Sequence, residues 1–96
     1  MTIFDFLHRR VNRLVEIRIA DSTICGYIDA VHRNKDNVIF FVRVTLVTSV
    51  LSGDHIAQGK KAFVVLDQEI GNRREGFSFT DDSSRKVEVI FLLAFL

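Results

Sequence analysis

The 96-residue sequence predicts a single, mainly β domain, in which an N-terminal helix precedes five strongly bent antiparallel strands that form a small barrel. Val, Ile and Thr, whose branched side chains favour strands, supply 26 of the 96 residues. From Leu14 onward apolar and polar side chains alternate with a period of two, as in a half-buried strand. No crossover helix separates the expected strands, so neighbouring strands are expected to run antiparallel.

The helix is expected over residues 3–12. Thr2 can cap it, and Asp5 then lies in the first turn, where the helix dipole favours a negative charge. Ile3, Phe6 and Leu7 recur at helical spacing and form one apolar stripe. We expect this stripe to cover the open end of the barrel, which spans residues 14–96.

Five strands follow from the alternation of apolar residues and from turn chemistry. They are expected over residues 14–19, 24–32, 38–51, 62–70 and 87–96, with loops over 33–37, 52–61 and 71–85. Gly26 inside the second strand indicates a bulge or a sharp bend. The third strand exceeds the usual length, which indicates that it curves around a barrel. Phe77 and Phe79 suggest a brief hairpin within the last loop.

Composition excludes several classes of protein. The formal net charge is +1, whereas a dedicated binder of double-stranded DNA carries a clear basic excess. One cysteine cannot form an internal disulfide, and no signal peptide is recognisable. The longest apolar run, Val89–Leu96, is far shorter than a membrane-spanning helix. The expectation is a soluble, cytoplasmic protein without a membrane partner.

No catalytic or metal-binding pattern stands out. The three histidines lie too far apart in sequence for the paired ligand spacing of small zinc domains. Cys25 sits in an apolar strand and is expected to be a packed side chain rather than a nucleophile. The carboxylate pairs at Asp67–Glu69 and Asp81–Asp82 are typical of solvated surface. The sequence therefore predicts no enzyme, no metal and no cofactor.

Two polar stretches can recognise single-stranded nucleic acid. His32, Arg33, Lys35 and Asn37 combine imidazole, cationic and amide groups, which can stack on bases, neutralise phosphates and hydrogen-bond to base edges. Arg85 and Lys86 precede the last strand and add two cations. The alternative interpretation is that both stretches are ordinary polar loops.

The order of features over residues 3–41 resembles the first motif of Sm-like proteins. A short helix precedes Leu14-Val-Glu-Ile-Arg-Ile, a turn, Gly26-Tyr-Ile, a polar loop and Asn37-Val-Ile-Phe. The second motif of that family, an Arg-Gly pair, is matched at best by Arg85-Lys86. The resemblance implies an SH3-like open barrel that assembles into rings and binds uridine-rich or adenine-rich single-stranded RNA at loops near the pore. Asn37 would then contact a base, His32 would stack, and the four cations would hold phosphates.

The last strand also indicates self-association, because both of its faces are apolar after Glu88 and one edge would be unpaired in a monomer. Pairing with a neighbour's fourth strand would generate a homo-oligomeric ring, for which the resemblance suggests five to seven copies. The residues expected at this interface are Val65, Leu66, Ile90, Leu92, Ala94 and Leu96. The alternative function is a structural or protein-binding ring with no nucleic-acid role.

Overall fold

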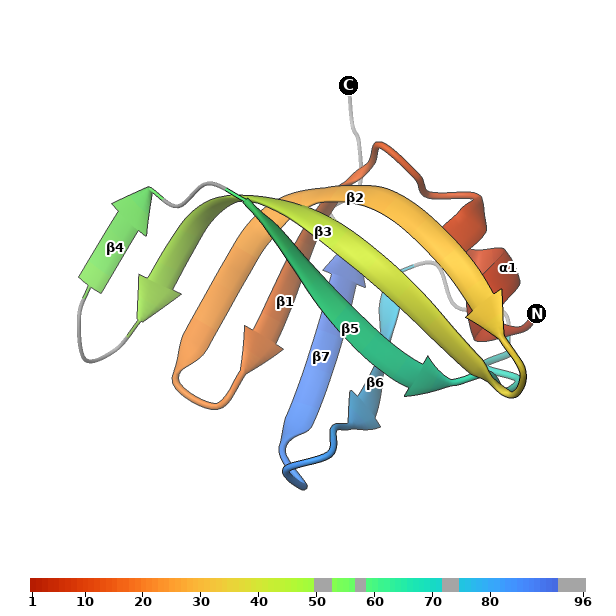
Figure 1. Ribbon diagram of the computed structural model, residues 1–96. Coiled ribbons are helices and arrows are strands. Elements are labelled where there is room, and N and C mark those ends of the chain that lie inside the picture. Colours follow the sequence, from red (N-terminus) through yellow and green to blue (C-terminus); the bar gives the residue numbers. More distant parts are fainter. Residues whose placement is uncertain (50–52, 57–58, 72–74, 92–96) are drawn as a thin grey trace.

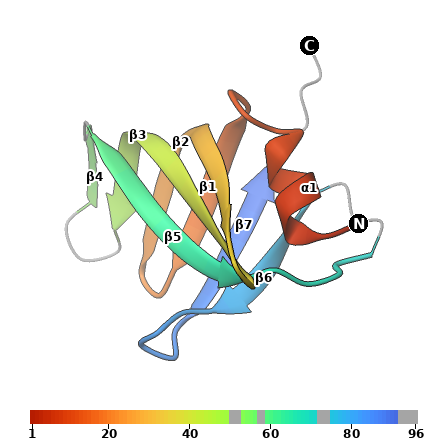
Figure 2. The same cartoon turned by 45° about the vertical axis from the view of Figure 1, so that its right-hand side comes forward.

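One antiparallel sheet curls around an apolar core in the computed structural model, which describes residues 1–49, 53–56, 59–71 and 75–91 (Figure 1). Within these residues the strand order is β4-β3-β2-β1-β7-β6, and β5 pairs with β3 as well. A short helix, α1, lies at one end of the curled sheet (Figures 1 and 2). The prediction of a mainly β chain with an N-terminal helix and a bent antiparallel sheet is confirmed.

Helix α1 (Ile3–His8) begins where the sequence predicts, because the Thr2 hydroxyl accepts a hydrogen bond of 3.2 Å from the backbone N–H of Asp5. It ends four residues earlier than the expected residue 12. Asn12 has a left-handed φ of 70°, and its N–H donates to the Ile28 carbonyl at 2.7 Å. This contact with the sheet replaces another turn of helix. Ile3, Phe6 and Leu7 are fully buried, as expected for the stripe that faces the core.

Strands β1 (Leu14–Ile19), β2 (Ser22–Asn34) and β3 (Asn37–Ser49) form the centre of the sheet. The register between β2 and β3 shifts at Cys25/Gly26 and again at Ile28/Ala30, which places irregularities where these 13-residue strands bend. The bulge expected at Gly26 is confirmed. The loop expected over residues 33–37 is shorter in the structure, since Asn34 and Asn37 already pair.

The structure has seven strands among the described residues rather than five. The additional strands are β4 (Gly53–Ile56), within the loop expected over 52–61, and β6 (Gly76–Thr80), within the stretch expected to be a loop with a brief hairpin. Both are too short to display a clear alternation. Each begins at a glycine with positive φ, 74° at Gly53 and 156° at Gly76, where the sequence suggested only a turn.

The last two expected strands also change. Strand β5 (Lys60–Leu66) starts and ends earlier than residues 62–70, and β7 (Lys86–Phe91) covers the first part of 87–96, whose remainder lies outside the described residues. Strand β7 pairs with β1 on one side and with β6 on the other. The edge that the sequence left free for a neighbouring copy is therefore occupied along β7 by the chain's own β6.

The core consists of side chains from α1 and the inner face of the sheet, and no charged or polar residue is buried among the described residues. Phe6 joins the helix to the far strands, because its ring makes edge contacts with Phe77 and Phe91 at centroid distances of 5.7 and 5.5 Å. No described pairing joins β5 to β6. The curled sheet is thus a half-barrel with two margins, one at β4 and β5 and the other at β6.

Candidate nucleic-acid interface

The tip of the β2–β3 hairpin brings together four of the six residues predicted to bind RNA. His32 and Arg33 end β2, Asn37 begins β3, and Lys35 lies in the intervening two-residue turn with a left-handed φ of 56°. All four side chains are exposed. The first polar stretch is therefore a compact feature at one corner of the sheet.

Arg33 nevertheless points away from its neighbours, because side chains alternate along a strand. It pairs with Val38 on the side of the sheet that carries the core. Its guanidinium lies 3.4 Å from the Asp67 carboxylate and 4.2 Å above the Phe4 ring. Arg33 thus links the hairpin to α1 and to the end of β5. An RNA phosphate would compete with Asp67 for it.

Arg85 and Lys86 lie elsewhere, at the β6–β7 turn. The Asp81 carboxylate accepts hydrogen bonds from the backbone N–H groups of Ser83 and Arg85, both at 2.9 Å, and from Arg85 Nε at 3.0 Å. These bonds, above all the one from the Arg85 backbone, hold the pKa of Asp81 below its ordinary value. Arg85 lines a pocket beside the first half of β5, whereas Asn37 pairs with Leu66 at the other end of that strand. The structure does not bring the two predicted stretches into one site.

The exposed surface of β2, β3 and β5 contains a candidate site that the sequence did not reveal. Paired residues in adjacent strands project on the same side, so the register defines rows across three strands. The first rows are Tyr27–Arg43–Lys60 and Ala30–Phe41–Ala62, and the next are His32–Ile39–Val64 and Asn34–Asn37–Leu66. We call these twelve residues the outer face. None of them is buried.

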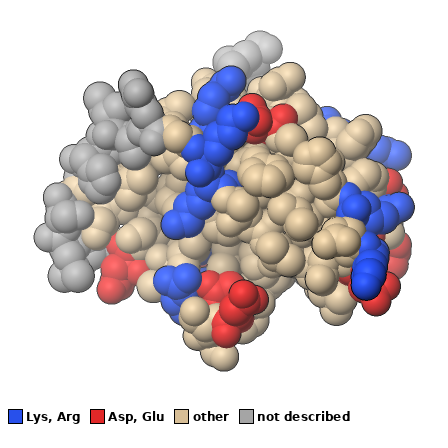
Figure 3. All heavy atoms as spheres, in the orientation of Figure 1, with Lys and Arg blue, Asp and Glu red and all other residues tan. Residues whose placement is uncertain are grey.

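Aromatic rings and cations lie close together on the outer face. The Arg43 guanidinium lies 5.5 Å from the centroid of the Tyr27 ring, and the His32 ring meets the edge of Phe41 at 5.9 Å. Lys60 forms an ion pair of 2.9 Å with Asp29, and its hydrogen bond lowers the pKa of that carboxyl. Figure 3 shows a stripe of Lys and Arg side chains over the start of β5, beside a broad uncharged area.

His32 and Asn37 are therefore predicted site residues that the structure places on a common surface, while Tyr27, Phe41, Arg43 and Lys60 were missed. Alternation alone could have grouped Phe41 and Arg43 with Asn37 on one side of β3. The alternation along one strand does not show which other strands lie next to β3. Tyr27 and Lys60 join the group only through cross-strand pairing.

The predicted interface residues are divided between the core and the surface. Val65 is buried on the inner face with 4% of its surface exposed, so it already packs within its own chain. Leu66 is 56% exposed and Ile90 is half-buried. Leu92, Ala94 and Leu96 lie outside the described residues. Of the described members, Leu66 offers the most surface to another copy.

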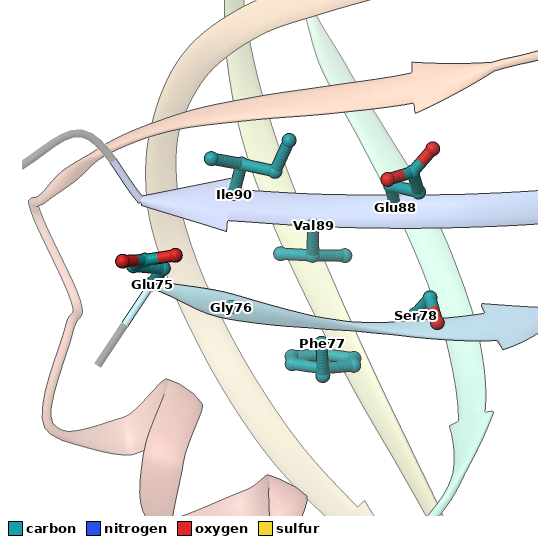
Figure 4. A pocket seen from close by; sticks show the side chains of 7 residues that line it. All are labelled: Glu75, Gly76, Phe77, Ser78, Glu88, Val89 and Ile90. Atoms are coloured by element: carbon teal, nitrogen blue, oxygen red, sulfur yellow. The ribbon is translucent and has the colours of Figure 1, made fainter. Parts of the chain in front are cut away.

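A pocket of about 260 Å³ on the β6–β7 hairpin has a different chemical character (Figure 4). Glu88, Ser78 and Glu75 bring oxygen atoms to it, and Gly76, which lies between Glu75 and Ser78 and pairs with Ile90, contributes no side chain. An anionic lining does not suit a nucleic acid. In the ranges that the structure describes, no three His, Cys, Asp or Glu side chains are placed to hold a metal ion.

Cys25 shows no activation as a nucleophile. It is a free thiol in β2 whose pKa is raised, first by partial burial and then by the charge of nearby Glu16. A raised pKa keeps the thiol protonated at neutral pH, which fits the expectation of a packed side chain.

No family model matches this chain, and no curated protein or solved structure matches it. Among the described residues, no helix is long and apolar enough to cross a membrane.

Proposed function

We propose that this protein binds single-stranded RNA on the outer face and the β2–β3 hairpin tip. One observation carries the proposal: Tyr27, His32 and Phe41 share an exposed sheet surface with Arg43 and Lys60. Single-stranded RNA is recognised by stacking its bases on aromatic side chains while cations follow the phosphates. The Sm-like resemblance of residues 3–41 supports the same ligand, although it suggests loops at a pore rather than a sheet face.

The residues have distinct roles in this proposal. Bases stack on the Tyr27 ring and on the rings of His32 and Phe41, which contact each other edge to face. The Asn37 amide forms hydrogen bonds with the edge of a base. Arg43 neutralises a phosphate at one end of the outer face, and Lys35 does so from the hairpin tip next to the other end. Lys60 contributes a third cation whose charge is partly balanced by Asp29. With about three phosphate contacts, the logarithm of affinity should fall with that of salt concentration with a slope of about −2.

Fluorescence anisotropy with short uridine-rich and adenine-rich RNAs at low and moderate salt tests the proposal. Tyr27→Ala should weaken binding by about 1–3 kcal/mol, the usual worth of one stacked base. Arg43→Gln should weaken binding and make the salt slope shallower by about 0.7.

Arg18→Gln is the matched control, because Arg18 is an exposed arginine on β1 whose guanidinium pairs with Glu16 outside the outer face. It should bind RNA as the unmodified protein does. Undetectable binding of either RNA at ~50 mM salt, where electrostatic contacts are strongest, would refute RNA binding. Equal losses for Arg18→Gln and Arg43→Gln would refute this location.

Self-association without nucleic acid is the second candidate function, and the exposure of Val64 and Leu66 favours it. These residues are 49% and 56% exposed on a strand at the sheet margin. Large apolar side chains on an uncovered edge strand favour pairing with another chain. The sequence predicts a ring of five to seven copies through the last strand, but β6 covers β7 over Lys86–Phe91, so a head-to-tail ring would have to pair β5 with a neighbour's β6. Light scattering decides it, since a stable 11.0 kDa monomer excludes a ring.

A further inference from the structure

The margin of the sheet along β5 carries unpaired backbone groups. The backbone N–H and C=O groups of the odd-numbered residues in this strand point toward β3. Two hydrogen bonds at the ends of the strand show this: the Val44 N–H donates to the Gly59 carbonyl at 2.9 Å, and the Asp67 N–H donates to the Asp36 carbonyl at 2.8 Å. Even-numbered residues therefore direct their N–H and C=O groups outward. In the part of the chain that the structure describes, no strand pairs with β5 on this side at Lys60, Ala62, Val64 or Leu66.

The chain itself closes the same edge immediately beyond β5. The N–H of Ile3 donates to the Gln68 carbonyl, and the N–H of Ile70 donates to the Met1 carbonyl, both at 3.0 Å. Residues 1–3 thus cover the edge at 68–70 and leave β5 as a bounded open segment. The first half of this segment, Lys61–Val64, also lines a pocket of about 220 Å³, and Phe79 and Asp82 of the β6–β7 hairpin line the same pocket.

The side chains of this segment are complementary to a second copy of itself. Four residues of β5 direct their backbone groups toward the open edge, and three of them, Ala62, Val64 and Leu66, have apolar side chains; the fourth is Lys60. The corresponding residues of β6, at the other margin of the sheet, are Gly76, Ser78 and Thr80. The segment also carries opposite charges at its two ends. Lys61 lies near its start, and Asp67, which also pairs with Arg33, follows its last residue.

Antiparallel pairing of two copies brings Lys61 of one copy near Asp67 of the other, whereas parallel pairing would align like charges. It also matches apolar side chains with one another. A contact between β5 and a neighbour's β6 would instead place Val64 beside small polar residues. Each feature favours a two-fold contact over a head-to-tail one.

We propose that β5 is a self-association edge at which two copies pair antiparallel about a two-fold axis through Phe63. This register sets Ala62 opposite Val64 of the second copy and Lys60 opposite its Leu66, so that all four outward-facing residues find partners. It ends before residues 68–70, where residues 1–3 already lie. The Lys60 stem covers Leu66 of the second copy while its ammonium stays with Asp29. Pairing at this edge extends the sheet sideways and leaves the outer face uncovered. The contact does not rest on RNA binding, although Lys60 takes part in both proposals.

Directed disulfide formation tests the contact. Ala62→Cys and Val64→Cys are made separately in the full chain with Cys25→Ser, one variant is labelled with ¹⁵N, and the two are mixed and oxidised mildly. Residues opposite each other in a hydrogen-bonded pair have Cα atoms about 5.5 Å apart, within the range for a disulfide. Mass spectrometry should show the mixed 62–64 link in several-fold excess over 62–62 and 64–64 links.

A third variant, Ser78→Cys, distinguishes the alternative assembly. A head-to-tail contact between β5 and β6 predicts 64–78 links and particles of five to seven copies, and either result overturns the two-fold contact. Equal amounts of all links, or none at protein concentrations of several hundred micromolar, overturn it as well.

Sedimentation velocity provides a second measurement that needs no cysteine. Val64→Lys should raise the dimer dissociation constant at least tenfold, because the substitution places a charge beside Ala62 of the second copy. Leu14→Lys replaces an exposed apolar residue on β1, away from the edge, and should leave the constant unchanged. Equal effects of the two substitutions would contradict the proposal.

Discussion

Gly26 shows how one residue permits the bend of the two longest strands. A Cβ atom at this position would collide with the Arg43 carbonyl oxygen and lie 3.0 Å from Cγ1 of Val42. Both neighbours belong to β3, whose register with β2 shifts beside Gly26. The missing side chain therefore lets the backbones of β2 and β3 approach closely where the sheet curls.

Gly26→Ala should lower the free energy of unfolding by about 3 kcal/mol, at the upper end of overpacking effects, because the atom it meets is backbone. Gly71→Ala is the control. Gly71 has a φ of 70°, but a Cβ added there would have nothing within 4 Å, so only backbone strain of about 1–2 kcal/mol applies. Urea unfolding measures both. A smaller loss for Gly26→Ala than for Gly71→Ala would show that β3 yields to the new methyl group.

Helix α1 is the element that closes one end of the half-barrel. Its Phe6 ring is fully buried and contacts the rings of Phe77 and Phe91. The Arg10 guanidinium lies over the Phe6 ring, 3.7 Å from its centroid. The helix has only six residues, so its own hydrogen bonds contribute little. Packing of this one face keeps it in place.

Phe6→Ala should cost about 3–5 kcal/mol of unfolding free energy through lost contacts and the cavity left behind. His8→Ala, on the exposed side of the same helix, should stay within about 0.5 kcal/mol of the unmodified protein. Thermal or urea unfolding followed by circular dichroism compares the two. A loss below about 0.5 kcal/mol for Phe6→Ala would mean that the helix is peripheral to the core.

The β6–β7 hairpin depends on its turn, where Asp81 accepts three hydrogen bonds. Its pKa is lowered in the folded chain, so the carboxylate stabilises the fold above the ordinary Asp value of about 3.9. This contribution is lost as the pH falls through the lowered pKa. Asp81→Ala should therefore be less stable than the unmodified protein at pH 7, and the difference should shrink below about pH 4.

Urea unfolding at pH 7 and pH 3 measures this difference, with Asp82→Ala as the control at the exposed neighbouring carboxyl. A difference that stays constant between the two pH values would assign the effect of Asp81→Ala to packing rather than to its charge.

At the scale of the whole fold, the open edge of β5 divides the backbone amides of this strand into two sets. The N–H groups of Phe63 and Val65 face β3, whereas those of Ala62, Val64 and Leu66 face outward. In dilute solution, hydrogen exchange measured by NMR should therefore alternate along β5, slow at odd positions and fast at even ones. Uniform protection along β5 at the lowest concentration would show that its outer edge is already covered.

A structural feature can be predicted from the sequence when the interactions that decide it join residues close together along the chain. The Thr2 cap, the buried stripe of α1, the bounds of β1 and the bulge at Gly26 depend on residues close in sequence, and the structure confirms them. Strands β4 and β6 escaped detection because four or five residues display too little alternation, and because long-range pairing decides whether they are strands.

Local signals in the chain suffice to specify a mainly β fold with a helix over its start, since branched side chains, periodicity and capping act over a few residues. They also place His32 and Asn37 near each other, because a hairpin joins them. Only the tertiary structure shows that Arg33 forms an ion pair with Asp67 and that Arg85 forms one with Asp81 in the β6–β7 turn. It also shows that β6 pairs with the edge of β7. Strand register brings residues distant in sequence into one row, and register is set by the packing of the complete sheet. For the same reason Tyr27, Arg43 and Lys60 form one surface that no local pattern announces.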